Sequence, residues 1–275
     1  MMDRILVPLD GSEKFTETLA YVVELGKGVA PEVLLLHVQA PAAAAEDHPV
    51  LKDYVDALEA RQWRVQAVVR TGDPVAEIVR FAVETGPALI VMSTHGRSGL
   101  ERIRAGSVTE QVLRQSPCPV FILHSTRPDT TADRHDHLFR RMLVPLDGSE
   151  VSAAILPCVE KFARHFNTEV ILFHDHPECD AAADAGRRRE FLDQHGVTLA
   201  NAGIPVQLDC STHRRPAQEI LSRIDALDID IVAMVSHGKG GVHRALDESV
   251  TANVMRHANR PLLVWSSDPQ CPRIG

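Results

Sequence analysis

The sequence is short of aromatic residues and of long apolar stretches. Phe, Trp and Tyr make up only 4% of its 275 residues, so a core built from the 44% hydrophobic residues must consist mainly of Val, Leu, Ile and Ala. No apolar run approaches the roughly 18 residues of a membrane helix. Met1–Arg4 leads directly into an apolar segment without the features of a signal peptide. We therefore expect neither a membrane span nor a secretion signal.

Cysteines are also few, and basic residues do not dominate. The five cysteines are an odd number without a Cys-X-X-Cys pair, which is typical of a reducing compartment. We expect a cytoplasmic protein in which Cys118, Cys158 and Cys210, each in or beside an apolar run, are small core residues. The formal net charge of −8 disfavours a nucleic-acid partner.

Several enzyme signatures are absent as well. The sequence contains no Walker A lysine motif, no His-Glu-X-X-His and no Gly-X-Ser-X-Gly nucleophile elbow. His95 follows an apolar run, but no nucleophile stands beside it in the sequence, and we interpret it as a residue that fixes its loop. We expect no catalytic residue.

What the sequence does contain is an internal repeat. The segment Leu6–Glu13 recurs unchanged as Leu143–Glu150, at an offset of 137 residues, and later pairs such as Ser107 with Ser249 follow at an offset of 142. This period is far longer than the repeats of solenoid proteins, so it indicates a duplicated domain. The polar stretch Ser125–Arg140 separates the copies. The predicted organisation is a first domain at 1–126, a linker at 127–137, a second domain at 138–267 and a tail at 268–275.

Each copy alternates apolar strand patterns with helical patterns. Continuous apolar strands separated by helices indicate a parallel sheet that is covered on both faces. We predict an α/β fold of two tandem doubly wound domains of flavodoxin-like size, each with a five-stranded parallel sheet. In such sheets ligands bind beyond the carboxyl ends of the strands, at the switch point. In the first copy the predicted strands are Arg4–Leu9, Val33–Val38, Val65–Val69, Ala88–Met92 and Pro119–Leu123.

A glycine-containing loop follows the fourth of these strands. Gly96 and Gly106 leave backbone N–H groups accessible, and Ser107 and Thr109 add hydroxyl donors. Ser107 with Glu110 fits a capping box, which predicts a helix that begins at Ser107. A loop between a strand end and a helix N-terminus is a natural anion site, although glycines of this kind also serve ordinary surface turns.

These residues together resemble the universal stress protein family. The resemblance rests on the Val-Pro-Leu-Asp-Gly-Ser-Glu strand end, on Ser-Thr-His-Gly-Arg, on Gly-Ser-Val-Thr-Glu and on Cys-Pro-Val, and it covers nearly the whole chain as a tandem pair. Members that bind ATP carry Gly, two residues, Gly, nine residues, then Gly-Ser or Gly-Thr. Here Ser93 stands at the first glycine, while Gly96 and Gly106-Ser107 keep the spacing. The resemblance implies an adenine nucleotide alpha hydrolase-like fold that binds ATP, with or without Mg²⁺, and at most a slow ATPase activity.

The resemblance also assigns residues to the nucleotide, with no metal ligand fixed. Asp10 would lie near the ribose or a metal. The assigned residues border the adenosine (Pro8, Leu9 and Asp10), contact adenine (Val38), lie along the nucleotide (Met92 and Ser93) or hold the phosphates (Gly96, Arg97, Gly106, Ser107, Val108 and Thr109).

The second copy departs from this pattern. Val235 replaces the first glycine of the motif, Glu248 replaces the third, and Asp175 stands where Val38 would contact adenine. A carboxylate at a helix N-terminus opposes a phosphate there. We therefore expect the second domain to have lost nucleotide binding while it keeps the fold.

Other candidates stay open beside this reading. The segments His174–Asp180 and His135–His137 contain metal-ligand residue types, but polar loops account for them as well. The alternatives to an ATP-binding stress or signalling protein are a nucleotide-free interaction or scaffold protein, and a protein that binds a small ligand or metal in its second domain. The resemblance further implies that the two copies form an intrachain pseudo-dimer, with a homodimer as an additional state.

Overall fold

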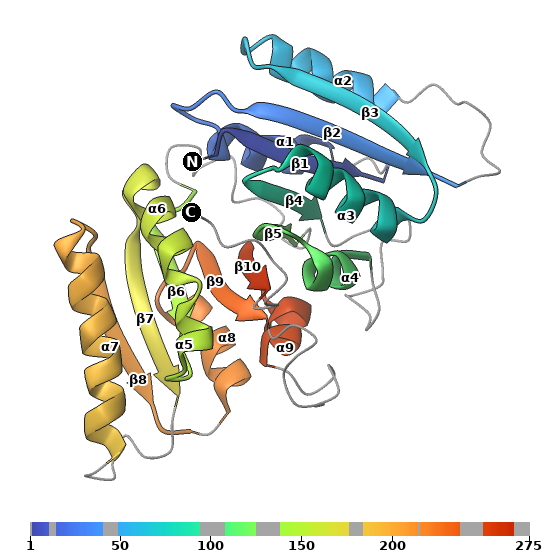
Figure 1. Cartoon of the computed structure of the whole chain (residues 1–275). Helices are drawn as coiled ribbons and strands as arrows, with labels where there is room; N and C mark the ends of the chain where they lie inside the picture. Colours follow the sequence, from blue (N-terminus) through green and yellow to red (C-terminus); the bar gives the residue numbers. More distant parts are fainter. Residues whose placement is uncertain are drawn as a thin grey trace. The chain divides into compact units, whose positions relative to one another are not determined.

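The computed structural model describes residues 2–10, 15–40, 49–93, 108–124, 138–175, 184–213, 215–236 and 250–266. These residues fall into two compact units, the first containing the described residues up to 124 and the second those from 138 onward (Figure 1). Each unit is a three-layer α/β domain built on five parallel strands.

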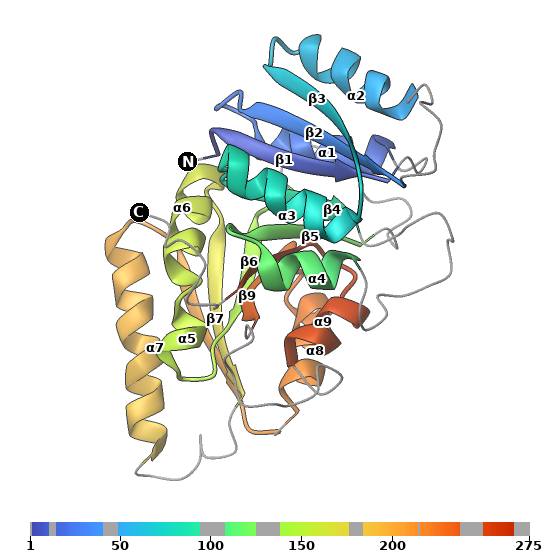
Figure 2. The same ribbon diagram turned by 45° about the vertical axis from the view of Figure 1, so that its right-hand side comes forward.

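The first unit has five parallel strands in the order β3-β2-β1-β4-β5. The chain moves outward from β1 to β3 and then crosses to the other side of β1, so the switch point lies between β1 and β4. Helices α1 and α2 contact each other and cover one face, while α3 and α4 contact each other and cover the opposite face (Figure 2). The elements are β1 (Arg4–Leu9), α1 (Phe15–Leu25), β2 (Glu32–Gln39), α2 (Pro49–Glu59), β3 (Val65–Thr71), α3 (Pro74–Thr85), β4 (Leu89–Ser93), α4 (Val108–Gln115) and β5 (Val120–Leu123).

The second unit repeats this topology, with the order β10-β9-β6-β7-β8. Its strands are again all parallel. The tandem doubly wound α/β fold predicted from the sequence is therefore confirmed. The elements are β6 (Arg141–Pro145), α5 (Glu150–Ala153), α6 (Leu156–Phe166), β7 (Glu169–Asp175), α7 (Asp184–Asn201), β8 (Val206–Ser211), α8 (Pro216–Ala226), β9 (Ile231–Ser236), α9 (Val250–His257) and β10 (Leu262–Ser266).

The central strands are almost fully buried, whereas the edge strands β3 and β8 alternate between exposed and half-buried residues. This difference corrects one sequence expectation. Cys118 is buried and Cys158 is half-buried, but Cys210 is exposed because it lies on β8. Burial raises the pKa of the Cys158 thiol to about 11, so that sulfur stays protonated.

The buried face of α1 also differs from the predicted one. The helical spacing of the apolar residues Phe15, Leu19, Val22 and Val23 predicts that they form the buried face; Val22 is buried, but Leu19 and Val23 are only half-buried. The helix is rotated so that a polar residue, Thr18, joins the core, and Tyr21 packs against Phe121 with ring centroids 6.1 Å apart. The buried residues of this helix are Thr18, Tyr21, Val22 and Leu25.

The second unit begins before the end of the stretch that polarity marked as linker. Phe139 is 2% exposed and packs against Phe162 and Phe166, with ring centroids 5.1 and 4.9 Å away. The hydroxyl of Thr168 donates to the Phe139 carbonyl at 2.7 Å. Phe139 therefore packs into the second unit, inside the range 138–267 that the sequence analysis expects for the second domain.

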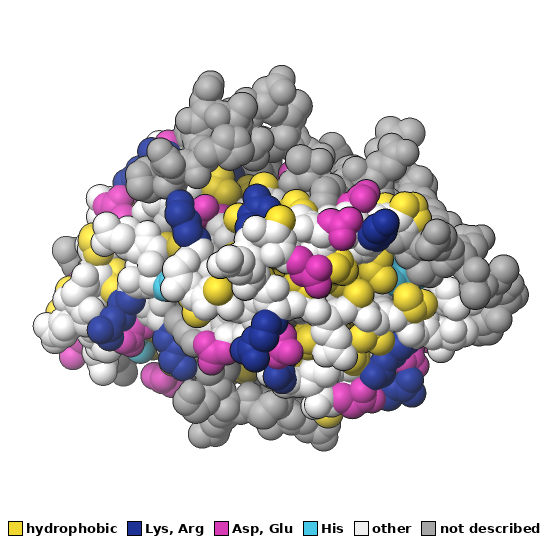
Figure 3. All heavy atoms as spheres, turned by 90° about the horizontal axis from the view of Figure 1, so that it is seen from above, with side chains coloured by type: hydrophobic (Ala, Val, Ile, Leu, Met, Phe, Trp, Pro, Cys, Tyr) yellow, Lys and Arg dark blue, Asp and Glu magenta, His cyan; other side chains and the backbone are white. Residues whose placement is uncertain are grey.

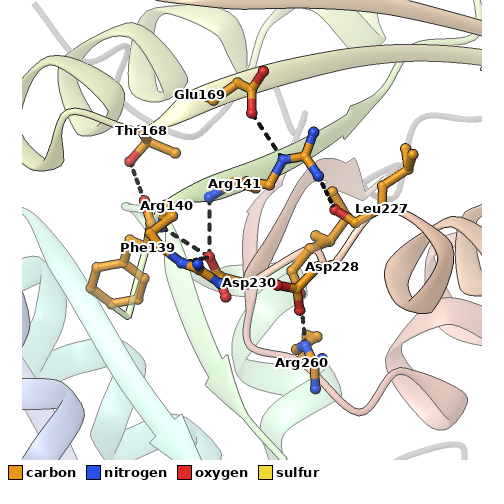
Figure 4. A network of polar contacts seen from close by, with 10 residues as sticks. Phe139, Arg140, Arg141, Thr168, Glu169, Leu227, Asp228, Asp230 and Arg260 are labelled. Carbon is orange, nitrogen blue, oxygen red and sulfur yellow. Dashed lines mark hydrogen bonds and ion pairs between the residues drawn. The ribbon is translucent and has the colours of Figure 1, made fainter. Parts of the chain in front are cut away.

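Polar contacts fix the amino ends of the strands in both units. In the second unit Arg141 donates to Glu169 at 2.8 Å and to the Leu227 carbonyl (Figure 4). In the first unit Arg4 donates to Glu32 at 2.7 Å and to the Thr85 carbonyl in the same way. These contacts lie at the sheet edge opposite the switch point, so they stabilise the fold rather than form a ligand site.

The second unit adds a buried carboxylate to this network. Asp230 is 5% exposed, and its Oδ2 accepts hydrogen bonds from the backbone N–H groups of Arg140 and Arg141 at 3.0 and 3.1 Å (Figure 4). Burial raises the pKa of Asp230, an effect that the nearby guanidinium of Arg140 reduces but does not cancel. The corresponding residue of the first copy is Ala88.

This raised pKa predicts a pH dependence of stability. The folded protein holds the Asp230 proton to a higher pH than the unfolded chain does, so its stability falls as the pH rises through the folded-state pKa. Asp230→Asn keeps an acceptor for the two N–H groups but does not titrate. We expect urea denaturation between about pH 4 and 7 to show a weaker loss of stability with rising pH in this variant. Equal pH profiles for the variant and the wild type would contradict the assignment; exposed Asp193→Asn is the control.

Helix α3 begins with a side-chain cap that its counterpart α8 lacks. Asp73 Oδ2 accepts a hydrogen bond from the Ala76 N–H at 2.9 Å, and Pro74 occupies the first turn. Arg215, at the start of α8, makes no side-chain cap bond. The chain therefore turns from β3 into α3 through Gly72 and Asp73.

We expect Asp73→Ala to lower the free energy of unfolding of the first domain by about 1 kcal/mol, because one N–H at the helix start loses its acceptor. Urea denaturation followed by the fluorescence of Trp63, in a Trp265→Phe background, measures this domain. Asp56→Ala removes the same charge from the exposed face of α2 and should cost less. If the two variants lose equal stability, the cap is not the cause.

Candidate functional site

The carboxyl ends of β1 and β4 meet at the switch point of the first domain. The two strands are neighbours, with Ile5 opposite Leu89 and Leu6 opposite Ile90. The predicted site residues on them lie at one edge of the sheet: Asp10 is exposed, Pro8, Leu9 and Ser93 are half-buried, and Met92 is buried. Val38, near the end of β2, is half-buried on the same edge. The structure thus brings together the part of the predicted site that these strands carry.

The remaining predicted residues lie on the loop and on α4. Gly96, Arg97, Gly106 and Ser107 lie outside the described residues. The described part of helix α4 extends from Val108 to Gln115, and Ser107, where the helix is predicted to begin, lies just outside it. The Glu110 carboxylate accepts from Arg114 at 3.2 Å, one turn further along the helix.

The resemblance assigns Thr109 on α4 to the phosphates, and the counterpart of this residue in the second domain has a structural role. Thr251, the counterpart of Thr109, donates through its Oγ1 to the Val235 carbonyl at 3.1 Å and so ties α9 to the end of β9. Thr109 is likewise buried, with 6% exposed, whereas Val108 is 39% exposed. From this burial we infer that any contact of Thr109 with a phosphate would come from its backbone N–H.

A histidine on the second strand fixes the end of the first strand in both domains. His37 Nδ1 lies 2.9 Å from the Leu9 carbonyl oxygen, and His174 Nδ1 lies 2.6 Å from that of Leu146. Because a carbonyl only accepts, Nδ1 must carry the proton and donate. The sequence offered a signal for this role, since His37 and His174 recur at the offset of the repeat and interrupt otherwise apolar strands.

Helix α2 contributes a buried phenol near Asp10 that the sequence did not indicate. The Tyr54 side chain is 1% exposed and makes a hydrogen bond with the Thr18 side chain. Burial raises the pKa of Tyr54 well above its ordinary value, and the negative charge of Asp10 acts in the same direction. The phenol is therefore neutral at physiological pH.

The same edge of the second domain has different chemistry. Asp175 ends β7, and its Oδ1 accepts from the Ser211 hydroxyl at 2.5 Å and from the His213 N–H at 3.2 Å. Asp147 Oδ1 accepts from both the N–H and the hydroxyl of Ser149, at 2.9 and 2.5 Å. Asp247 and Glu248, which distinguish the motif of this copy, lie outside the described residues.

The candidate metal ligands are not assembled within the described ranges. Among those residues no group of three or more His, Cys, Asp or Glu side chains is placed to hold a metal ion. The rest of the two candidate segments, His135–His137 and His176–Asp180, lies outside them. No helix in the described part of the chain is long and apolar enough to cross a membrane.

Charges on the described surface are mixed. On the face drawn in Figure 3, basic and acidic side chains are interspersed. Each domain also has an ion pair between a strand and a helix. Arg70 contacts Glu84 and packs over the Phe81 ring, and Arg223 contacts Asp209.

Comparisons with known proteins agree with the repeat. The model of the Universal stress protein family matches the chain twice, at residues 1–124 and 138–265. A universal stress protein of Methanocaldococcus jannaschii is 29% identical over 143 residues, which are 46% of this chain and 84% of that protein. A universal stress protein of Mycobacterium tuberculosis is 26% identical over 216 residues, covering 74% of this chain and 70% of that protein.

Solved structures with a similar fold come from the same family. The crystal structure of a universal stress protein from Archaeoglobus fulgidus covers 98% of this chain and all of its own, with a TM-score of 0.74 and 24% identity. A putative universal stress protein from Pseudomonas aeruginosa covers 96% of this chain and 93% of its own, with a TM-score of 0.73 and 18% identity. At these identities the two structures support the fold alone.

Proposed function

Because the chain belongs to the universal stress protein family, we propose that it binds ATP in its first domain and acts as a cytoplasmic stress-response or signalling protein. The observation that carries this proposal is the position of the glycine motif. Gly96, Gly106 and Ser107 keep the spacing of the family's ATP-binding members, and they occupy the connection between β4 and α4 at the switch point. A strand-to-helix connection at that place is where an α/β sheet binds phosphates.

The strand ends support the proposal from the other side of the site. Asp10 ends β1 as an exposed charge, suited to a ribose hydroxyl or to Mg²⁺, and half-buried Val38 offers an apolar contact for adenine. Ser93 replaces the first glycine of the motif, but it is small and half-buried. We assign no catalytic residue, because no general base stands beside a group that could position water, and we expect ATP hydrolysis to be slow.

We propose that the second domain does not bind ATP. Asp175 stands where the first domain has Val38, and Glu248 comes shortly before α9 in the sequence. Both charges oppose a triphosphate, and the opposition is strongest where water is excluded. A nucleotide-free interaction or scaffold protein remains the second candidate for the whole chain, favoured by Ser93 and by this degenerate copy.

The experiment that tests the proposal is the identification of bound nucleotide. Purified full-length protein is denatured, and the released small molecules are analysed by mass spectrometry, followed by isothermal titration of the nucleotide-free protein with ATP. We expect an adenine nucleotide to be released and ATP to bind saturably. Absence of both signals would favour the scaffold protein.

We also propose that the two domains pair as an intrachain pseudo-dimer. In the first domain β5 pairs with β4, and in the second domain β10 holds the same place beside β9. Both strands are apolar and buried, as expected of strands that another element covers. We expect a Phe121→Cys and Val264→Cys pair to form crosslinks with a short reagent within one chain. Crosslinks that appear only between chains would indicate a homodimer, and their complete absence would refute the pairing.

A further inference from the structure

Strand β8 is the outermost strand of the second domain. It pairs with β7, and no other strand among the described residues pairs with it. The Pro205 carbonyl accepts from the Val170 N–H at 2.8 Å, so Pro205 and every second residue after it direct their backbone groups toward β7. The backbone N–H and C=O groups of Val206, Leu208 and Cys210 therefore point outward from the sheet.

This outer edge lacks the features that usually protect an exposed strand. Folded proteins guard such edges with lysines, prolines or bulges. The pairing of β8 with β7 runs through Val206–Ser211 without a bulge, and the only charged side chain in this range, Asp209, is bound by Arg223. Pro205 belongs to the residues that face β7, so its missing N–H does not interrupt the outer edge. The strand is therefore a complete template for pairing with another strand.

Apolar side chains are exposed at the same place. Leu208 is 43% exposed, and Cys210 is exposed as well. Helix α7 comes close to the strand at Gly196, where an added Cβ would lie 3.1 Å from Leu208 Cδ2. The next residue of that helix, Val197, is 59% exposed. The strand and the helix that covers it thus both leave apolar side chains open to water.

We propose that β8 pairs antiparallel with β8 of a second copy of this chain, about a two-fold axis at Leu208, so that the sheets of two second domains continue into each other. In this register Leu208 lies opposite Leu208 of the second copy, and Val206 lies opposite Cys210. The outward backbone groups of these residues then bond to each other, and their apolar side chains meet on one face. The inference rests neither on ATP binding in the first domain nor on the pairing of the two domains within one chain.

The opposite face of the ladder favours a second copy of β8 over the corresponding strand of the first domain. Gln207 lies opposite Asp209 of the second copy, and an amide N–H is a donor for a carboxylate oxygen. In β3 the counterpart of Leu208 is Ala67, and a two-fold axis there would set Arg64 against Arg70. Like charges directly opposite each other destabilise a sheet. The sequence of β8 is therefore matched to its own copy, and that of β3 is not.

The first test is sedimentation equilibrium of the full chain over a range of concentrations. We expect the wild type to form a reversible dimer. Leu208→Lys sets two positive charges against each other on the two-fold axis and should weaken the dimer at least about tenfold. Val69→Lys makes the same change at a 43% exposed position of β3 and should leave the dimer unchanged. A wild type that stays monomeric, or a dimer that Leu208→Lys does not weaken, would overturn the proposal.

A disulfide tests the register. Val206→Cys, combined with Cys179→Ser and Cys271→Ser, should give a dimer linked through Cys210 under mild oxidation, because hydrogen-bonded residues opposite each other have Cα atoms about 5.5 Å apart. Adding Cys210→Ser should remove this link. Ala67→Cys in the same serine background is the matched control on β3 and should not be crosslinked. A disulfide between position 67 and Cys210 of another copy would show that β8 accepts the β3 edge instead, which would overturn the self-pairing.

Discussion

Replacing Gly106 by Glu should abolish ATP binding while the first domain remains folded. The substitution introduces into the first copy the residue that the second copy carries as Glu248. A carboxylate at the start of α4 would occupy the positive end of the helix and face the triphosphate across a few Å. We expect at least about a 100-fold loss of affinity in isothermal titration, because this repulsion acts where the phosphates should be held.

The repeat itself supplies the reason to expect an intact fold. The second domain forms the same order of five parallel strands with Glu248 in its sequence. Gly106→Ala separates the effect of charge from the effect of a side chain, and it should weaken ATP much less. The reverse change, Glu248→Gly, should not create a second ATP site, because Val235 and Asp175 remain. A Gly106→Glu protein with near wild-type affinity would show that this loop does not hold the phosphates.

Truncating Phe139 to Ala should destabilise the second domain by about 3–5 kcal/mol. Its ring is fully enclosed and packs edge-on against Phe162 and Phe166, so the substitution leaves a cavity at the centre of an aromatic cluster. The sequence is poor in aromatic residues, and this cluster holds three of its eight phenylalanines. The loss tests the proposal that the second domain begins near residue 138.

The measurement is urea denaturation followed by Trp265 on β10, in a Trp63→Phe background, so that the fluorescence reports the second domain. Phe139→Leu refills part of the cavity and should recover more than half of the loss. Val197→Ala, at a position that is 59% exposed, should change little. A small effect of Phe139→Ala would place Phe139 in the linker after all.

The sheet was predictable because its signals are local and repeated. The strands expected at Arg4–Leu9 and Val33–Val38 agree with β1 and β2 to within a residue, since a continuous apolar run between helices has one good interpretation. The face of α1 was predicted less well: of the expected residues, Val22 is buried, but Leu19 and Val23 are only half-buried. The choice depends on what the helix packs against, and Tyr21 finds its partner 100 residues away in Phe121.

Contacts between distant residues account for most of what the sequence left unseen. Asp230 binds backbone groups about 90 residues earlier in the chain, and no spacing rule connects the two. The hydrogen bonds that Asp175 accepts from Ser211 and His213 are also invisible in sequence, where the residue only looks like a departure from Val38. The glycine motif, in contrast, is recognisable from its specific spacing in the sequence. The contacts of its residues with phosphates remain predictions that binding measurements must test.

The most direct test of the central claim is the number of ATP molecules bound per chain. Nucleotide-free protein of verified concentration is equilibrated with ATP and Mg²⁺, and the bound nucleotide is measured by equilibrium dialysis at saturation. The account predicts one ATP per chain for the wild type, and none for Gly106→Glu. Two per chain would show that Asp175, Val235 and Glu248 do not prevent nucleotide binding in the second domain, and none in the wild type would contradict the assignment of ATP to the first.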